Sequence, residues 1–162
     1  MRKMGIFGAY AAIGEETPLS MDCGKLCAAA CCAPDADGQG GVYLFPGEER
    51  ILRDADWATI VDAGRFAPVL VCSGVCPRGQ RPLGCRIFPL TPVRTDRGWT
   101  VRIDARARAM CPLAGSGIHG LRSAFVRAVR RAVRLLAEEP GGEEFLRSWA
   151  AEEQAFRDGA RL

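Results

Sequence analysis

Apolar residues recur at three- and four-residue spacing between residues 118 and 137, and this pattern predicts a long amphipathic helix. Its apolar face is formed by Ile118, Leu121, Phe125, Val129, Val133 and Leu136. We expect Ser116 to cap the helix at its start, and the Pro140-Gly141-Gly142 segment to end it. A second amphipathic stretch follows, with an inward face of Phe145, Leu146, Trp149 and Phe156. Because the turn is short, the two stretches should pack as a C-terminal helical hairpin over about residues 116–158.

Shorter patterns upstream predict strands. Residues 99–104 alternate between apolar and polar side chains, as a half-buried strand does, and a turn at 95–98 allows a hairpin with residues 87–94. Residues 42–45 and the apolar run at 68–71 predict two more short strands. Residues 48–64 are expected to form a helix, with Ile51, Leu52, Ala55 and Ile60 on an irregular apolar face. Residues 35–41 are rich in Asp and Gly and predict a turn.

These elements predict an α+β fold, in which an irregular cysteine-rich part with short strands (about residues 20–112) is closed by the helical hairpin. A chain of 162 residues fits one domain, residues 1–162, and its 48% hydrophobic and 25% charged residues are typical of a globular protein. The formal net charge of +3 gives no bulk electrostatic case for nucleic-acid binding. No apolar run approaches the ~20 residues that a membrane span needs.

The N-terminal segment has some features of a signal peptide. Arg2 and Lys3 precede an apolar stretch at residues 4–13, and the segment from Ala9 to Ala11 resembles a signal-peptidase site. Cleavage there would leave an apolar core shorter than the usual ~7–15 residues, and glycines interrupt it. We therefore expect this segment to pack on the domain, and the protein to be cytoplasmic, with no membrane partner.

The eight cysteines fall in three places along the chain. These cysteines are Cys23, Cys27, Cys31 and Cys32, then Cys72, Cys76 and Cys85, and finally Cys111. A reducing cytosol disfavours structural disulfides, and a domain of this size does not need them. Thiolates are soft metal ligands, so all eight cysteines are candidate ligands for one or two metal centres.

The first group raises a question of geometry. If residues 26–32 are helical, Cys27 and Cys31 share a face and Cys32 points ~100° away from Cys31. Adjacent thiolates in that arrangement do not easily serve one tetrahedral ion. Three interpretations stay open: the two cysteines serve different centres, one is a bystander, or the local backbone is not helical.

The spacing leaves the metal open between zinc and iron. The Cys-x2-Cys pairs of common zinc sites are absent, because both groups use Cys-x3-Cys. Cys76 and Cys111 are each followed by proline, a pairing found in some iron–sulfur sites. Basic residues lie within a few positions of the cysteines and could offset thiolate charge or simply be solvated. They are Lys25, Arg78, Arg81 and Arg86.

The segment RPLGCRIFP at residues 81–89, preceded by Cys72 and Cys76 and by a group ending in Cys31-Cys32, resembles the YkgJ-type cysteine-cluster family. That family is described as a zinc- or iron-chelating domain, so the resemblance implies metal binding through the clustered cysteines. It covers residues 23–111, about half of the chain. The family's first group is usually tighter, Cys-x2-Cys-x2-Cys-Cys, so the chain departs from the pattern at Cys23. Flagellin lysine methylase resembles the family too, but it is much longer, and we carry over no methylase activity.

These observations favour a small metal-binding protein with a structural, sensing or metal-handling role. One alternative is a redox or transferase enzyme that uses an iron–sulfur cluster. Another is a zinc-scaffolded module that binds an acidic partner through a basic face of Arg127, Arg130, Arg131 and Arg134. Glutamates at 138, 139, 143 and 144 are close enough in sequence to neutralise that face. No catalytic residue is assigned: the single histidine, His119, is expected at the surface, and the G-x-G-x-x-G match at 115–120 lacks flanking strands.

Overall fold

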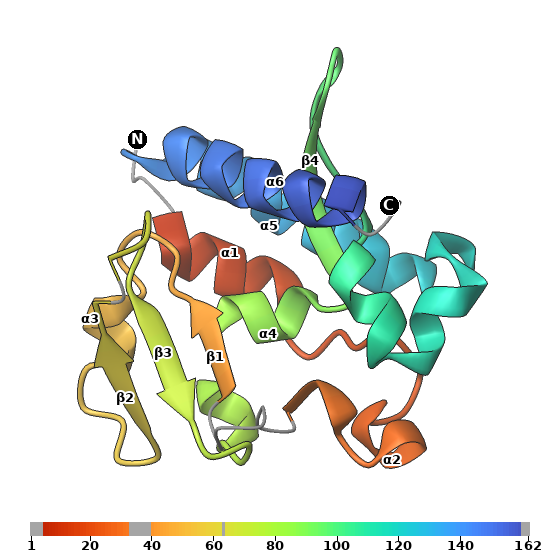
Figure 1. Cartoon of the computed structure of the whole chain (residues 1–162), viewed down its shortest axis with the longest axis horizontal. Helices are drawn as coiled ribbons and strands as arrows, with labels where there is room; N and C mark the ends of the chain where they lie inside the picture. The colour runs from red at the N-terminus through yellow and green to blue at the C-terminus, as the bar shows by residue number, and fades with distance from the viewer. Residues whose placement is uncertain (1–4, 33–39, 63, 160–162) are drawn as a thin grey trace.

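The computed structural model describes residues 5–32, 40–62 and 64–159. Within them it contains helices and two small antiparallel sheets, so the α+β class is confirmed. Helices α1 (Gly5–Ile13), α5 (Ser123–Ala137) and α6 (Gly142–Gly159) form one layer, with a three-stranded sheet and α2 (Gly24–Cys27) below it in Figure 1. Most of the predicted turn at 35–41 lies outside the described residues, as do Arg2 and Lys3.

Helix α1 packs along α5, and together they supply much of the main hydrophobic core. Ile6, Ala9 and Ile13 of α1 are buried, as are Val129 and Val133 of α5. The apolar N-terminal stretch therefore packs on the rest of the chain over the part that is described. In the described part of the chain, none of the helices combines the length and apolar character needed to cross a bilayer.

The C-terminal helical hairpin is present, but α5 begins at Ser123 and not at residue 118. Three short 3₁₀ turns precede it: η3 (Ala105–Ala109), η4 (Pro112–Ser116) and η5 (Ile118–Gly120). A Cβ at Gly120 would lie 2.5 Å from the Cβ of Ser116, so this connection is tightly wound. The prediction that Ser116 caps the helix is wrong, because the residue before α5 is Arg122.

The inward face predicted for the second helix is correct at Phe145, Leu146 and Trp149, which are buried. It is wrong at Phe156, which is 48% exposed. The residue lies near the end of α6, the helix that packs against the hairpin of strands β4 (Leu90–Thr95) and β5 (Gly98–Ile103). That hairpin is confirmed, with a register that runs from Leu90 opposite Ile103 to Thr95 opposite Gly98.

The three-stranded sheet has the order β1 (Gly40–Tyr43), β3 (Val69–Cys72), β2 (Ala58–Val61), with both neighbours antiparallel to β3. The predicted helix at 48–64 is wrong. Among the described residues of this range, only α3 (Glu49–Leu52) is helical, and the chain then turns back as β2. Pairing with β3 outweighs local helical preference here, and Leu52 packs with Leu44 and Leu70 in a second, smaller core. Cys72, at the end of the central strand, is partly buried against this second core.

Candidate metal centre

The eight cysteines come from six segments of the chain, and their sulfurs lie near one another. Cys23 directly precedes α2, and Cys27 is its last residue. Cys31 and Cys32 lie in the 3₁₀ turn η1 (Ala30–Cys32). The others are Cys72 at the end of β3, Cys76 in the following loop, Cys85 in α4 (Leu83–Ile87) and Cys111 just before η4. All eight thiols are free, Cys31 and Cys85 are exposed, and the others are half-buried.

The first cysteine segment is not a continuous helix. Helix α2 stops at Cys27 because Ala28 and Ala29 both have positive φ, 52° and 54°. The N–H of Ala29 donates to the carbonyl of Gly24 at 2.9 Å, which closes the segment into a tight loop. Such left-handed backbone costs alanine about 1–2 kcal/mol per residue. Of the three interpretations of the Cys31-Cys32 pair, the one with a non-helical backbone is therefore correct for this segment, and the pair is not tied to a helical face.

The second cysteine segment, which carries Cys72, Cys76 and Cys85, is held in place by the close packing of α4. A Cβ at Gly84 would lie 2.5 Å from Cγ2 of Val42 and 3.1 Å from Trp149, so only glycine allows α4 to approach β1 and α6 this closely. The approach places Cys85 opposite α2. Arg86 stabilises the loop before α4, because its guanidinium donates to the carbonyls of Arg81 at 2.7 Å and Gly79 at 2.9 Å.

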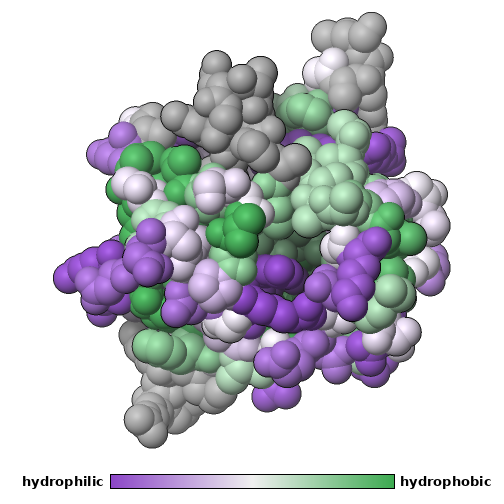
Figure 2. All heavy atoms as spheres, turned by 90° about the horizontal axis from the view of Figure 1, so that it is seen from below, coloured by the Kyte–Doolittle hydropathy of each residue, from purple (hydrophilic) through white to green (hydrophobic). Residues whose placement is uncertain are grey.

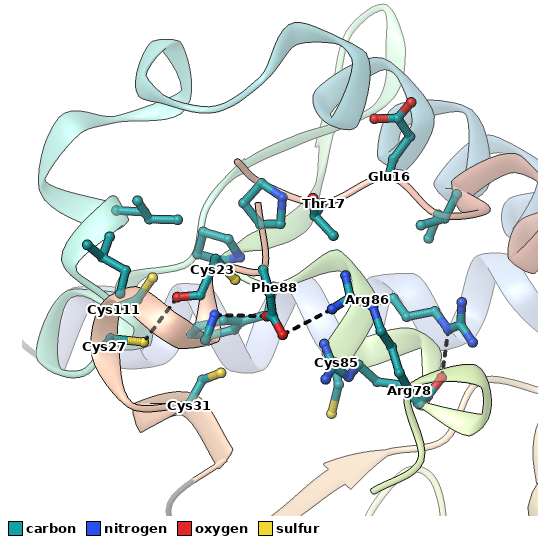
Figure 3. Close-up of a pocket in the computed structure, with 18 of the residues that line it drawn as sticks. Glu16, Thr17, Cys23, Cys27, Cys31, Arg78, Cys85, Arg86, Phe88 and Cys111 are labelled. Atoms are coloured by element: carbon teal, nitrogen blue, oxygen red, sulfur yellow. Dashed lines mark hydrogen bonds and ion pairs between the residues drawn. The ribbon is translucent and has the colours of Figure 1, made fainter. Parts of the chain in front are cut away.

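A cavity of about 210 Å³ separates the two cysteine segments on the face of the molecule seen in Figure 2, which is hollowed there. Five thiols line it: Cys23, Cys27, Cys31, Cys85 and Cys111. In Figure 3 the side chains of Cys23, Cys27 and Cys111 lie together beside α2, whereas Cys85 lies apart from them, near Arg86. The cavity therefore has thiols on opposite walls.

Neighbouring thiols shift one another's pKa values through hydrogen bonding and electrostatic interaction. Cys31 donates a hydrogen bond to the sulfur of Cys32, which raises the pKa of Cys31 and, with help from Arg81, lowers the pKa of Cys32 to about 6. Burial, followed by Asp22 and the sulfurs of Cys111 and Cys27, raises the pKa of Cys23. The vicinal pair thus favours one thiolate next to one thiol.

Cys85 opens to the cavity, yet protein atoms crowd it on its other sides. This desolvation raises the pKa of Cys85 to about 12, and the nearby sulfurs of Cys32, Cys76 and Cys72 add to the effect. A metal ion that binds these sulfurs has to displace the thiol protons, so the opposing pKa values make metal binding pH-dependent.

Arg81 is the cation that lies among the sulfurs. Burial disfavours its charge, but a hydrogen bond to Cys76 and the charges of Cys76, Cys32 and Cys85 outweigh burial, so the pKa of Arg81 is raised. Its Nε is buried without a hydrogen-bond acceptor among the described residues. The other predicted basic partners act differently: Arg78 pairs with Asp22 at 3.1 Å, and Lys25 is exposed and does not line the cavity. Sequence proximity to cysteines did not distinguish Arg81 from these residues.

In the arrangement shown, no three His, Cys, Asp or Glu side chains of the described residues lie close enough together to hold a metal ion. Four thiolates around zinc, each at about 2.3 Å, would lie about 3.8 Å from one another. The structure thus gathers the sulfurs of Cys23, Cys27 and Cys111 in one place without bringing them to ligand distance. His119 is exposed, as expected.

Comparison of the chain with family models, curated proteins and solved structures gave no match. The resemblance to the YkgJ-type family therefore stays a prediction that rests on the cysteine spacing and the RPLGCRIFP segment.

Proposed function

We propose that this protein binds zinc or an iron–sulfur centre through its clustered cysteine thiolates. The observation that carries the proposal is that free thiols far apart in the sequence lie near one another. Five of them, Cys23, Cys27, Cys31, Cys85 and Cys111, line one cavity, and Cys32, Cys72 and Cys76 lie near Cys85. Half-buried thiols that are not paired in disulfides are typical of soft-metal sites in a reducing compartment.

Metal binding would also explain features that are unfavourable in the metal-free chain. Two consecutive alanines hold a left-handed backbone next to Cys27, and the guanidinium of Arg81 is partly buried with an unpartnered Nε. Backbone strain and unpartnered donors of this kind persist where a bound ligand offsets their energetic cost. On this proposal the cysteine segments move by a few ångströms to reach ligand distance, so part of the binding energy orders them.

The position of the main core favours metal handling or sensing over a purely structural role. The core is built by α1, α4, β4, β5, α5 and α6, and it contains none of the eight cysteines. A domain whose core forms without the metal does not need the ion in order to fold, in contrast to small zinc fingers. The ion can therefore exchange while the helical layer stays intact.

The test is a metal count on protein purified without oxygen. A brown protein with iron and acid-labile sulfide indicates an iron–sulfur centre, and a colourless protein with bound zinc indicates zinc. The control is the same protein after alkylation of its thiols, which should bind neither. A fully reduced protein that binds no zinc and accepts no iron–sulfur cluster would overturn the proposal.

The basic face on α5 supports the interaction module as a second candidate. Arg127, Arg131 and Arg134 are exposed, and none of the four arginines forms an ion pair within the part of the chain that the structure describes. The predicted neutralisation by neighbouring glutamates does not occur there, since Glu143 instead pairs with Arg147 at 2.9 Å. The double variant Arg127→Glu/Arg131→Glu should abolish capture of an acidic peptide if this face is used, and unchanged capture would exclude it.

A further inference from the structure

We infer that the eight thiols form two separate four-thiolate centres, which share no ligand and meet at the vicinal pair Cys31-Cys32. The first centre consists of Cys23, Cys27, Cys31 and Cys111. The second consists of Cys32, Cys72, Cys76 and Cys85. This inference rests on the proposed function and deepens it, because it states how many ions the chain holds and which thiols hold each one.

The first set is defined by mutual neighbours around α2. The sulfur of Cys23 is under the electrostatic influence of Cys111 and Cys27, and that of Cys31 is under the influence of Cys23 and Cys27. The three labelled side chains of Cys23, Cys27 and Cys111 lie together in Figure 3. From the other set, Cys32 acts on Cys31 most strongly, as the acceptor of its hydrogen bond. These four thiols therefore form one group.

The second set is defined by the neighbours of Cys85. The sulfurs that act on it most strongly are those of Cys32, Cys76 and Cys72, in that order. These residues come from η1, the end of β3, the following loop and α4. Cys85 also lines the cavity, whereas Cys32, Cys72 and Cys76 do not.

The backbone explains how two adjacent residues join different groups. Ala28 and Ala29, with positive φ, turn the chain back after α2, so that η1 crosses between α2 and the sheet. Cys31 then has Cys23 and Cys27 as neighbours, and Cys32 has Cys85 of α4 as a neighbour. This placement lets the two adjacent thiols serve different centres.

Arg81 lies where the two sets meet. It interacts with Cys23 of the first set and with Cys32, Cys76 and Cys85 of the second. Each four-thiolate centre around a divalent ion carries a charge near −2, so two neighbouring centres repel each other. A partly buried guanidinium with an unpartnered Nε reduces that repulsion and can donate to a metal-bound thiolate.

Zinc binding provides the test, with the count of ions per chain measured by native mass spectrometry on the full-length protein. The wild type should hold two zinc ions. Double variants that each remove two thiols should then differ in the number of zinc ions they keep, depending on whether the two thiols belong to one set or to both. Cys23→Ser/Cys111→Ser, within one set, should keep one ion, as should Cys72→Ser/Cys85→Ser. Cys111→Ser/Cys72→Ser, across the sets, should keep none, and so should Cys31→Ser/Cys32→Ser.

A second measurement does not depend on variants that fold. At one equivalent of zinc, alkylation followed by peptide mapping of the wild type should show whole sets protected together. Cys23 and Cys111 should be protected in the same molecules, and Cys72 and Cys85 in the same molecules. Replacement of Arg81 by Gln should weaken binding of the second zinc about 10–100-fold, and Arg81→Lys should weaken it less.

The outcomes separate this inference from the proposed function. A wild type that holds one ion, or within-set and cross-set variants that lose metal equally, would overturn the two-centre arrangement and leave metal binding intact. A wild type that holds no zinc and no cluster would overturn both. Retention of one ion by the cross-set variants would also contradict the assignment.

Discussion

The carboxylate of Glu48 accepts a hydrogen bond from the backbone N–H of Leu83 at 2.6 Å, across 35 residues of sequence. The same buried carboxylate accepts the N–H of Phe45 at 2.9 Å and the hydroxyl of Tyr10. Tyr10 lies in α1, Phe45 follows β1 and Leu83 begins α4, so one side chain joins three elements. Because α4 carries Cys85, Glu48 fixes the position of the second cysteine segment relative to the core.

Replacement of Glu48 by Gln should destabilise the fold. Three donors converge on two oxygens, and an amide offers only one acceptor, so one buried N–H would face an NH₂ group. A buried donor without a partner costs about 1–3 kcal/mol, which lowers the Tm by several degrees in a domain of this size. Thermal unfolding, followed from acid to neutral pH, measures the effect. The neighbouring Glu49→Gln is the matched control, since Glu49 forms no hydrogen bond or ion pair with the described residues, and equal Tm shifts in the two variants would contradict the role of Glu48.

The pH dependence of the same variant has a definite sign. Burial raises the pKa of Glu48 above its ordinary value of 4.5, although hydrogen bonds from Tyr10, Leu83 and Phe45 oppose the shift. A carboxyl with a raised pKa in the folded state stabilises the fold below pH 4.5 and loses that contribution as the pH rises through the folded pKa. The stability advantage of the wild type over Glu48→Gln should therefore be largest at acid pH and shrink toward neutral pH.

Glu153 in α6 should show the opposite dependence. The carboxylate is buried, but it accepts the N–H of Ala105 at 2.9 Å and pairs with Arg157 at 2.7 Å and with Arg102. Burial opposes its charge, yet these donors outweigh burial and lower the pKa of Glu153. Its contribution is present above the ordinary value of 4.5 and is lost as the pH falls through the folded pKa.

Urea unfolding over a range of pH tests this expectation with the variant Glu153→Gln. At neutral pH the variant should lose about 2–3 kcal/mol of unfolding free energy, because a charged acceptor shared by two arginines is removed. The loss should diminish below pH 4.5. Glu144→Gln, an exposed substitution on the same helix, serves as control and should change little. A loss at Glu153 that is constant with pH would contradict the lowered pKa.

Periodicity predicted the elements whose own side chains form the core. The spacing of Phe125, Val129 and Val133 predicted α5, and the alternation around Trp99 and Val101 predicted β5, because each pattern records which face is buried. Residues 48–64 carry no such regular pattern. Their division into α3 and β2 depends on pairing with β3, which lies later in the chain, so local sequence could not predict it.

The candidate site could be predicted in composition but not in arrangement. Cysteine spacing identified all eight candidate ligands, since thiols are rare enough for clustering to be informative. Their grouping depends on the left-handed turn at Ala28 and Ala29, on the close approach at Gly84 and on the bridge from Glu48 to Leu83. None of these features has a sequence signal of its own, since alanine does not favour positive φ and buried Glu48 resembles any helix-starting glutamate.

Glycine at position 28 or 29 should stabilise the loop between Cys27 and Cys31. Glycine adopts positive φ without the penalty that alanine carries, so Ala29→Gly should gain about 1 kcal/mol locally. A gain of this size slows exchange of the amide that Ala29 donates to Gly24 by about fivefold, which hydrogen exchange of the metal-free protein measures. The control Ala30→Gly lies in the adjacent 3₁₀ turn, without positive φ, and should not slow exchange. Faster exchange in Ala29→Gly would show that the left-handed turn is not formed in solution.

Removal of the metal should loosen the cysteine segments and leave the helical layer intact. The main core contains none of the cysteines, so its packing does not depend on the ion, whereas α2 and the 3₁₀ turn η2 (Arg78–Gln80) contain no buried residue. Trypsin should therefore cut the metal-loaded protein slowly at Lys25 and Arg78, and at least tenfold faster after chelation, if the loosening costs about 1.4 kcal/mol or more of local stability. Cleavage at Arg127 and Arg131 of α5 provides the internal control and should stay slow in both states. If chelation accelerates cleavage at all four sites equally, the ion holds the whole fold together, and a structural role replaces the handling or sensing role proposed here.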